Sequence, residues 1–239
     1  MAGEFPNQPK ILRGAFVEYG LSIPPLFVVF QFNPVQLTRN RSSSFSVPGG
    51  FQQAVNELSR QAGQPSRYFT LREYHGLFDN LTDLRNAQDV RIQPETVSFE
   101  IRLDATDKLN DGDAIVETFG IAPELSTLEL MMHPKSESIL GSLFADSPDG
   151  FSFTDTDKPP MVLFIWGRKR VLPVNINSMN ITETEFSNTL DPIRATVNVN
   201  LTVIEGPNVP YQYTKVLKEA ASALNLANIG SIADVVIPG

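Results

Sequence analysis

The feature that most restricts the fold is the run Ile193–Glu205, in which apolar and polar side chains alternate as far as Val203. The apolar set is built from Ile, Ala, Val and Leu, and the polar set from Arg, Thr and Asn. A period of two places the sets on opposite faces of a β-strand, which here would span about 43 Å at about 3.3 Å per residue. The chain therefore contains an unusually long strand with one buried and one polar face, ended by Gly206 and Pro207.

Other segments also have strand patterns. They are Ile11–Tyr19, Leu26–Phe32, Val97–Leu103, Met161–Trp166 and Leu172–Ile181. Leu26–Phe32 is nearly all apolar, so we expect it to be buried on both faces. In the last segment the apolar positions slip by one residue between Ile176 and Met179, which predicts a β-bulge. A turn at Asn188–Pro192 then precedes the long strand.

Helical patterns are fewer. One helix is expected from about Ala114 to Met132, split near Pro123, after a loop at 104–113. Tyr213–Ala227 predicts an amphipathic C-terminal helix, whose apolar stripe consists of Val216, Leu217, Ala220, Ala221 and Leu224, and Phe51–Ala62 could form another helix. The expected fold class is α+β, mainly β: an antiparallel β-barrel or sandwich with one packed helix, insertions and a C-terminal helix.

The domain boundaries follow from changes in composition. Residues 1–205 are predicted to form one domain, with a core at about 10–33, 96–134 and 159–205. Within it, the polar stretches 34–95 and 135–158 are insertions or extended loops. Residues 206–239 are predicted to be a C-terminal helical extension.

Composition excludes several classes of protein. The chain of 239 residues has no cysteine and two histidines, which removes disulfide scaffolds, zinc–thiolate sites and multi-histidine metal sites. Nineteen basic and 27 acidic residues give a net charge of −8, which argues against nucleic-acid binding. No signal peptide and no membrane-spanning run is visible, so we expect assembly in the cytoplasm without direct membrane insertion.

No catalytic constellation emerges. The acidic cluster around Asp107 and Asp113 does not match a calcium-binding loop, because Leu109 and Thr118 occupy two ligand positions. We expect Asp113 to cap the following helix instead. The sequence predicts no catalytic, cofactor-binding or metal-binding residues, no cofactor and no enzymatic activity.

Two features remain open to more than one interpretation. The basic clusters Arg39/Arg41 and Arg168–Arg170 could be solvated or could contact an acidic neighbour. The polar face of Ile193–Glu205 could face solvent, line a channel or add to the sheet of a neighbour.

Four segments resemble the tube proteins of contractile injection systems. They are FQFNPVQLTRNRS (Phe30–Ser42), SFEIRLDATD (Ser98–Asp107), PPMVLFIWG (Pro159–Gly167) and the hairpin Asn177–Glu205. They occur in the family's order and frame about 70% of the chain. The turn at Leu190–Pro192 lacks the glycine usual in the family, which predicts an altered turn.

The resemblance implies a phage tail-tube-like fold that assembles as homohexameric rings. It favours the adaptor that connects the inner tube to the spike hub, although the LysM domain that adaptors often carry is absent from this sequence. The implied partners are other copies of the chain, the inner tube protein, the spike hub protein and other baseplate components. The alternatives are the inner tube protein itself and a monomeric β-sandwich binding module.

Overall fold

The computed structural model describes residues 11–20, 26–46, 56, 60, 71–133 and 159–227. Contacts divide the chain into two compact units, one formed by 1–39 with 96–239 and the other by 40–95. The expected loop at 135–158 lies outside the described residues, as does the expected helix at Phe51–Ala62 apart from Asn56 and Arg60.

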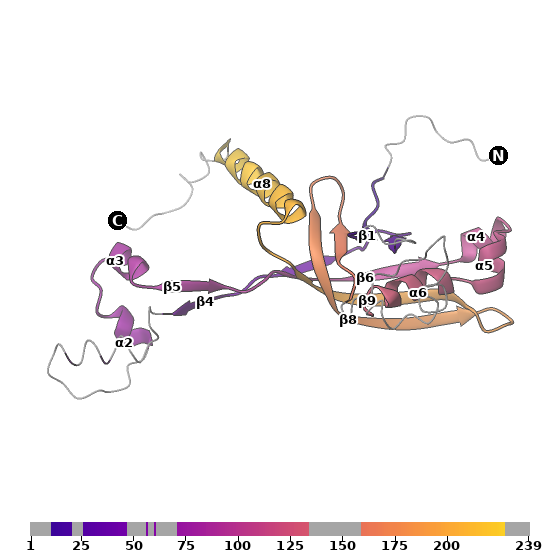
Figure 1. Cartoon of the computed structure of the whole chain (residues 1–239), viewed down its shortest axis with the longest axis horizontal. Helices are drawn as coiled ribbons and strands as arrows, with labels where there is room; N and C mark the ends of the chain where they lie inside the picture. The colour runs from indigo at the N-terminus through magenta and orange to yellow at the C-terminus, as the bar shows by residue number, and fades with distance from the viewer. Residues whose placement is uncertain are drawn as a thin grey trace, which may run out of the picture. The chain divides into compact units, whose positions relative to one another are not determined.

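The larger unit is built on a seven-stranded sheet in the order β2-β1-β7-β8-β9-β6-β3 (Figure 1). Each strand pair with a defined register is antiparallel. The strands are β1 (Ala15–Glu18), β2 (Phe27–Val29), β3 (Leu37–Asn40), β6 (Thr96–Asp104), β7 (Val162–Ile165), β8 (Val171–Phe186) and β9 (Pro192–Val203). The α+β, mainly β fold class is therefore confirmed.

The long alternating segment forms β9, and its neighbour β6 follows the same two-residue period, as does β8 from Val174 to Ile181 on either side of its bulge. In β9, Ala195, Val197, Val199, Leu201 and Val203 are all buried. The register of β8 against β9 shifts between Ile176 and Ser178, which confirms the predicted bulge.

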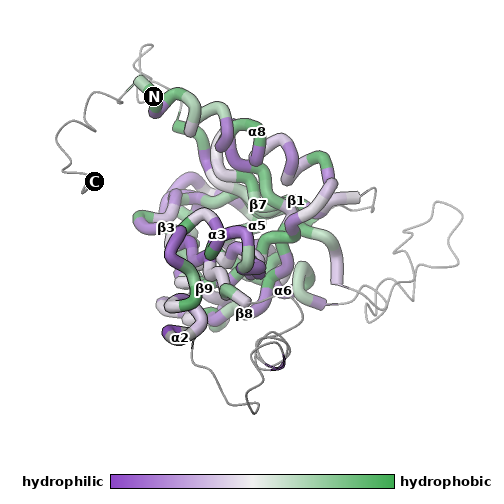
Figure 2. The backbone as a smooth tube through the Cα atoms, turned by 90° about the vertical axis from the view of Figure 1, so that its left-hand side faces the viewer, coloured by the Kyte–Doolittle hydropathy of each residue, from purple (hydrophilic) through white to green (hydrophobic). Residues whose placement is uncertain are grey.

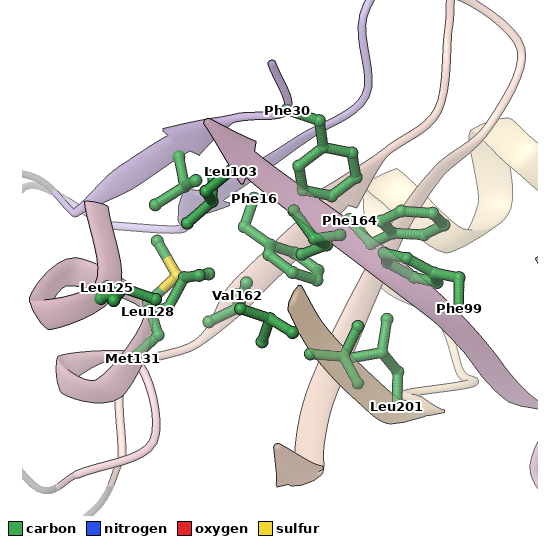
Figure 3. Packing of buried hydrophobic residues seen from close by; sticks show 14 of the residues in the cluster. Phe16, Phe30, Phe99, Leu103, Leu125, Leu128, Met131, Val162, Phe164 and Leu201 are labelled. Atoms are coloured by element: carbon green, nitrogen blue, oxygen red, sulfur yellow. The ribbon is translucent and has the colours of Figure 1, made fainter. Parts of the chain in front are cut away.

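The sheet folds over onto itself around a cluster of phenylalanines (Figure 3). Phe30, directly after β2, lies 5.6 Å from Phe99 of β6 between ring centroids, and Phe16 of β1 lies 6.0 Å from Phe99. In the sheet order β2 and β6 are five places apart. In a flat sheet that would be about 24 Å, at about 4.8 Å per strand. The close approach of these rings requires strong curvature, as in a barrel or sandwich.

Helices cover one end of this core. They are α4 (Thr106–Asn110), α5 (Ala114–Phe119) and α6 (Ala122–Leu130), and α6 contributes the buried residues Leu125 and Leu128. The prediction that residues 104–113 are only a loop was wrong, because α4 forms there. The expected split is present, but it falls at Gly120 and Ile121, and Pro123 lies in the first turn of α6.

The prediction that Leu26–Phe32 is buried on both faces was wrong. β2 is an edge strand, with Phe27 61% and Val29 50% exposed, because it pairs only with β1 in the described part of the sheet. The C-terminal helix, α8 (Val209–Leu224), begins earlier than expected and buries only Thr214. Its expected apolar stripe is largely uncovered, with Val216 and Leu224 exposed, and Figure 2 shows hydrophobic and hydrophilic residues side by side along the helix.

The smaller unit pairs β4 (Ser43–Ser46) with β5 (Asp89–Ile92) in an antiparallel ribbon. Between these strands lie α2 (Leu71–His75) and α3 (Leu81–Asn86). Tyr74 is buried, and its hydroxyl donates to the Ala87 carbonyl over 3.0 Å. Near the base of the ribbon, the Arg41 guanidinium lies 3.1 Å from the Glu95 carboxylate.

Candidate assembly surface

The three longest strands, β6, β9 and β8, lie side by side (Figure 1). They share a face on which fifteen aligned positions carry no apolar side chain, and beyond these positions Phe186 pairs with Pro192 on the same face. Their register aligns this face in five rows of three residues. The rows are Thr96–Thr202–Asn175, Ser98–Asn200–Ser178, Glu100–Asn198–Asn180, Arg102–Thr196–Thr182 and Asp104–Arg194–Thr184. We call this set the polar face.

The opposite face of the same strands is apolar at all but one of the aligned positions. Its rows are Val97–Leu201–Ile176, Phe99–Val199–Met179, Ile101–Val197–Ile181 and Leu103–Ala195–Glu183. Because side chains alternate strictly along a strand, burying this apolar set forces the whole polar set outward. The position of the polar face is thus fixed by the core.

Side chains on the polar face bond to one another. The Asn177 amide, at the bulge of β8, donates to Asn200 Oδ1 over 3.2 Å and to Thr202 Oγ1 over 2.6 Å. Asn200 in turn donates to Ser98 Oγ over 3.1 Å. The bulge thus supplies an extra amide that links β8 to β9, and Asn200 continues the link to β6. Cross-strand polar pairs of this kind stabilise a sheet and satisfy its donors.

Charges are confined to one end of the polar face and are paired there. Arg194 Nε lies 2.7 Å from Asp104 Oδ2, and its Nη1 lies 2.6 Å from Glu185 Oε1. Arg102 Nε lies 2.8 Å from Glu100 Oε1. Two arginines and two carboxylates within the five rows leave no net charge on the polar face.

Asp104 is the titratable group that this network perturbs. Partial burial raises the pKa of its carboxyl group. Hydrogen bonds from the Thr106 hydroxyl and amide and from Arg194 outweigh that effect, so the pKa lies below its ordinary value. Asp104 is therefore ionised at neutral pH and joins the end of β6 to the start of β9.

The segment Phe30–Pro34 joins two distant edges through side-chain amides. Gln31 Nε2 donates to the Asp104 carbonyl over 2.7 Å, and Gln31 Oε1 accepts from the Asp104 amide over 2.8 Å. Asn33 does the same before β1, accepting from the Gly14 amide at 2.9 Å and donating to the Leu12 carbonyl at 2.8 Å. This role was not predicted from the sequence, although the two amides alternate there with the aromatic residues Phe30 and Phe32.

Gly14 is required where this segment passes. A Cβ atom there would lie 2.6 Å from Cδ2 of the fully buried Phe30 and 2.8 Å from Cε3 of Trp166. Any side chain at this position would therefore force the two rings apart.

The structure places the residues that the sequence singled out, namely the acidic cluster and the basic turn, as follows. Asp113 accepts hydrogen bonds from the amides of Ile115 and Val116, so its predicted role as a helix cap is confirmed. Within residues 11–20, 26–46, 71–133 and 159–227, no three His, Asp or Glu side chains gather in a way that could hold a metal ion. Arg168 lies exposed in the turn between β7 and β8, and its carbonyl accepts from the Tyr213 hydroxyl.

No helix in the part of the chain that the structure describes is both long and apolar enough to cross a membrane. No protein-family model matches the chain. No curated protein has a significantly similar sequence.

Proposed function

We propose that this chain is a structural, non-enzymatic subunit of a contractile injection system. In this proposal it forms a homohexameric ring that connects the inner tube to the spike hub and the baseplate. It assembles in the cytoplasm and becomes part of a phage-tail-like particle. The sixfold ring and the identity of these partners come from the resemblance of four sequence segments to the tube protein family.

The observation that carries the proposal is the polar face of β6, β9 and β8. The wall of a conduit must stay hydrated and must not retain what passes along it. Apolar patches would bind exposed apolar groups, and an excess of one charge would retain cargo of the opposite charge. Eleven of the fifteen positions carry Ser, Thr or Asn, and the four charges cancel, so the polar face has the chemistry that such a wall needs.

Ring assembly also needs surfaces that pair with neighbours, and the sheet offers open edges. β2 and β3 each have one strand neighbour in the described part of the sheet. Edge strands bind other strands through their unpaired backbone groups. A head-to-tail contact that closes on itself then gives a ring. The uncovered apolar side of α8 and the separate unit at 40–95 are suited to contacts with tube, hub or baseplate proteins.

The first test is a pull-down of the tagged chain from its native cells, examined by negative-stain electron microscopy and quantitative mass spectrometry. The adaptor function predicts rod-like particles with a baseplate and a copy number equivalent to about one ring per particle. A copy number equivalent to many stacked rings would identify the inner tube protein instead. Recovery of the chain alone, without tube, hub or sheath proteins, would refute the assembly proposal and favour a monomeric binding module.

A second test asks whether the polar face lines an enclosed space. The chain contains no cysteine, so Asn198→Cys, at the centre of the polar face, gives one thiol in an otherwise unreactive chain. We expect a small maleimide to label it in intact particles and a bulky polyethylene-glycol maleimide to be excluded. After dissociation both reagents should react. Ser222→Cys, on the exposed part of α8, is the control. Both maleimides should react with its thiol in the dissociated chain, which checks that both reagents are active.

A further inference from the structure

A cavity lies against the outer edge of β2. Its volume is about 290 Å³, and consecutive residues of two segments line it, Phe27–Val29 of β2 and Leu103–Ala105 at the end of β6. Val116 and Ile121, at the helical end of the core, complete an apolar wall. Because residues from both faces of β2 line the cavity, the cavity must lie beside the strand, at its edge.

The backbone of β2 presents to this cavity hydrogen-bonding groups that pair with no other strand in the described part of the chain. The Phe30 amide donates to the Gly14 carbonyl and the Glu18 amide donates to the Leu26 carbonyl, both over 2.8 Å. Backbone groups of an antiparallel strand alternate in direction, so those of Leu26, Val28 and Phe30 point towards β1. Those of Phe27 and Val29 point the other way, towards the open edge. β2 therefore has two residues whose backbone groups face a cavity that α6 borders on another side, and these groups can pair with a segment that enters the cavity.

A second cavity, of about 1,050 Å³, adjoins the first. Both are lined by Arg13, Gln31, Leu103 and Asp104, so the two spaces meet where Gln31 bonds to the end of β6. The outer part of the second cavity carries the exposed apolar residues Ile11, Phe32 and Val35. Together the cavities form a continuous groove, with apolar residues beside β2 and at Ile11, Phe32 and Val35, and with polar and charged residues along the rest of the second cavity.

The charges around this groove leave one cation uncompensated. Each carboxylate that lines the cavities has a cationic partner: Asp104 pairs with Arg194, Glu100 with Arg102, and Glu124 with Lys108. Arg13 has no partner among the described residues. Side chains two residues apart lie on the same face of a strand, so Arg13 shares a face with Ala15 and Val17. These two residues pair with Val29 and Phe27, so the Arg13 side chain lies on the same face of the sheet as Phe27 and Val29.

We propose that the open edge of β2 binds an extended segment of a partner protein in which one acidic residue lies between two apolar residues. The backbone of that segment pairs with Phe27 and Val29 and extends the sheet by one strand. Its apolar side chains enter the cavity beside β2, and its carboxylate binds Arg13 on the other side of the added strand. Alternation along a strand requires this order of side chains. The proposal concerns the isolated chain and holds whether or not a ring forms.

The probe is a phage-displayed library of random linear peptides, panned on the purified full chain. We expect enrichment of peptides with Asp or Glu flanked by aliphatic or aromatic residues. A selected peptide, synthesised with a fluorophore and titrated by fluorescence anisotropy, should bind Arg13→Ala about tenfold more weakly, since a charge-assisted hydrogen bond is lost. Arg13→Glu should weaken binding further, and exchanging the acidic residue of the peptide for Lys should restore it.

Val29→Pro tests the backbone pairing separately. It removes an amide hydrogen on the open edge and leaves the pairing of β2 with β1 intact, because proline is tolerated on the outer side of an edge strand. We expect binding to fall about fivefold, which corresponds to one lost backbone hydrogen bond. Arg168→Glu, which changes an exposed arginine outside the groove, is the matched control and should bind as the wild type does.

Several results would overturn the proposal. They are a library without enriched peptides, enriched peptides that lack an acidic residue, and equal affinity for wild type and Arg13→Glu. Normal binding to Val29→Pro would show that the segment does not pair with β2. Circular dichroism of each variant checks that the chain is folded, and Arg13→Ala, at an exposed residue without a described partner, keeps the test valid if Val29→Pro does not fold.

Discussion

Replacing Gln31 with Met tests whether side-chain amides hold the curved sheet closed. Met has a similar length and shape but cannot bond to the Asp104 amide, which now donates over 2.8 Å, or to the Asp104 carbonyl, which now accepts over 2.7 Å. A neutral hydrogen bond contributes about 1 kcal/mol net, and a backbone group left without a partner costs about 1–3 kcal/mol. Gln31 and Asp104 are only half-buried, so water can partly replace the lost bonds. We therefore expect a loss of about 2 kcal/mol.

The loss is best measured by hydrogen exchange at the Asp104 amide together with thermal unfolding. A decrease of about 2 kcal/mol raises the exchange rate about 30-fold, since each 1.4 kcal/mol is about a factor of ten. The melting temperature should fall by about 4–8 °C. The matched control is Gln36→Met, because the Gln36 amide makes only a long, exposed contact of 3.5 Å with Thr38. It should change stability by less than about 0.5 kcal/mol.

An unchanged exchange rate at the Asp104 amide in Gln31→Met would refute the reasoning. It would mean that the phenylalanine cluster alone holds the folded-over sheet in place. A loss equal to that of Gln36→Met would lead to the same conclusion.

Three further predictions concern backbone strain and pH. Gly120→Ala should lower the free energy of unfolding, measured by chemical denaturation, by more than about 3 kcal/mol, because its Cβ would lie only 2.0 Å from the Pro192 carbonyl oxygen. Gly167→Ala, also at positive φ but with open space around it, should lower it by only about 1–2 kcal/mol. Equal losses would contradict the steric explanation. Leu190→Gly should raise the unfolding free energy by about 0.5–1 kcal/mol, since Leu190 is 78% exposed and has a φ of 69°, and a lower melting temperature would contradict this. The pKa of Asp104 is lower in the folded than in the unfolded chain, so its ionised carboxylate stabilises the fold above the unfolded pKa, and this stability is lost as the pH falls through the folded pKa. Asp104→Asn should therefore remove about 0.5–1 kcal/mol of the acid-induced loss of stability, measured by melting curves over a series of pH values. An unchanged pH dependence would contradict this prediction.

Six of the nine described strands were predictable because their information is local, whereas β3, β4 and β5, of four residues each, were missed in the stretch 34–95, which was predicted to be an insertion or extended loop. Alternation in β9 and β6 follows directly from burying one face of a sheet, and a phase slip in that alternation identified the bulge in β8. The cap formed by Asp113 was predictable for the same reason, since a cap bonds to amides two and three residues away.

What failed depended on neighbours that are distant in sequence. An apolar run such as Leu26–Phe32 looks the same in a central strand and in an edge strand, and only the sheet order shows that β2 is at the edge. The helix α4 was missed because its five residues are too few for a periodic pattern. The exposure of the apolar stripe on α8 also depends on what packs against it, which no periodicity contains.

The sequence by itself determined the six strands outside residues 34–95, the bulge, and the division of β6, β8 and β9 into an apolar and a polar side, because these depend on the two-residue period of a strand. Only the tertiary structure decided which residues close the curved sheet and which edge stays open. Gln31 meets Asp104 across 73 positions, and Arg194 meets it across 90. Contacts of that range arise from sheet order and curvature, which side-chain alternation along one strand does not contain.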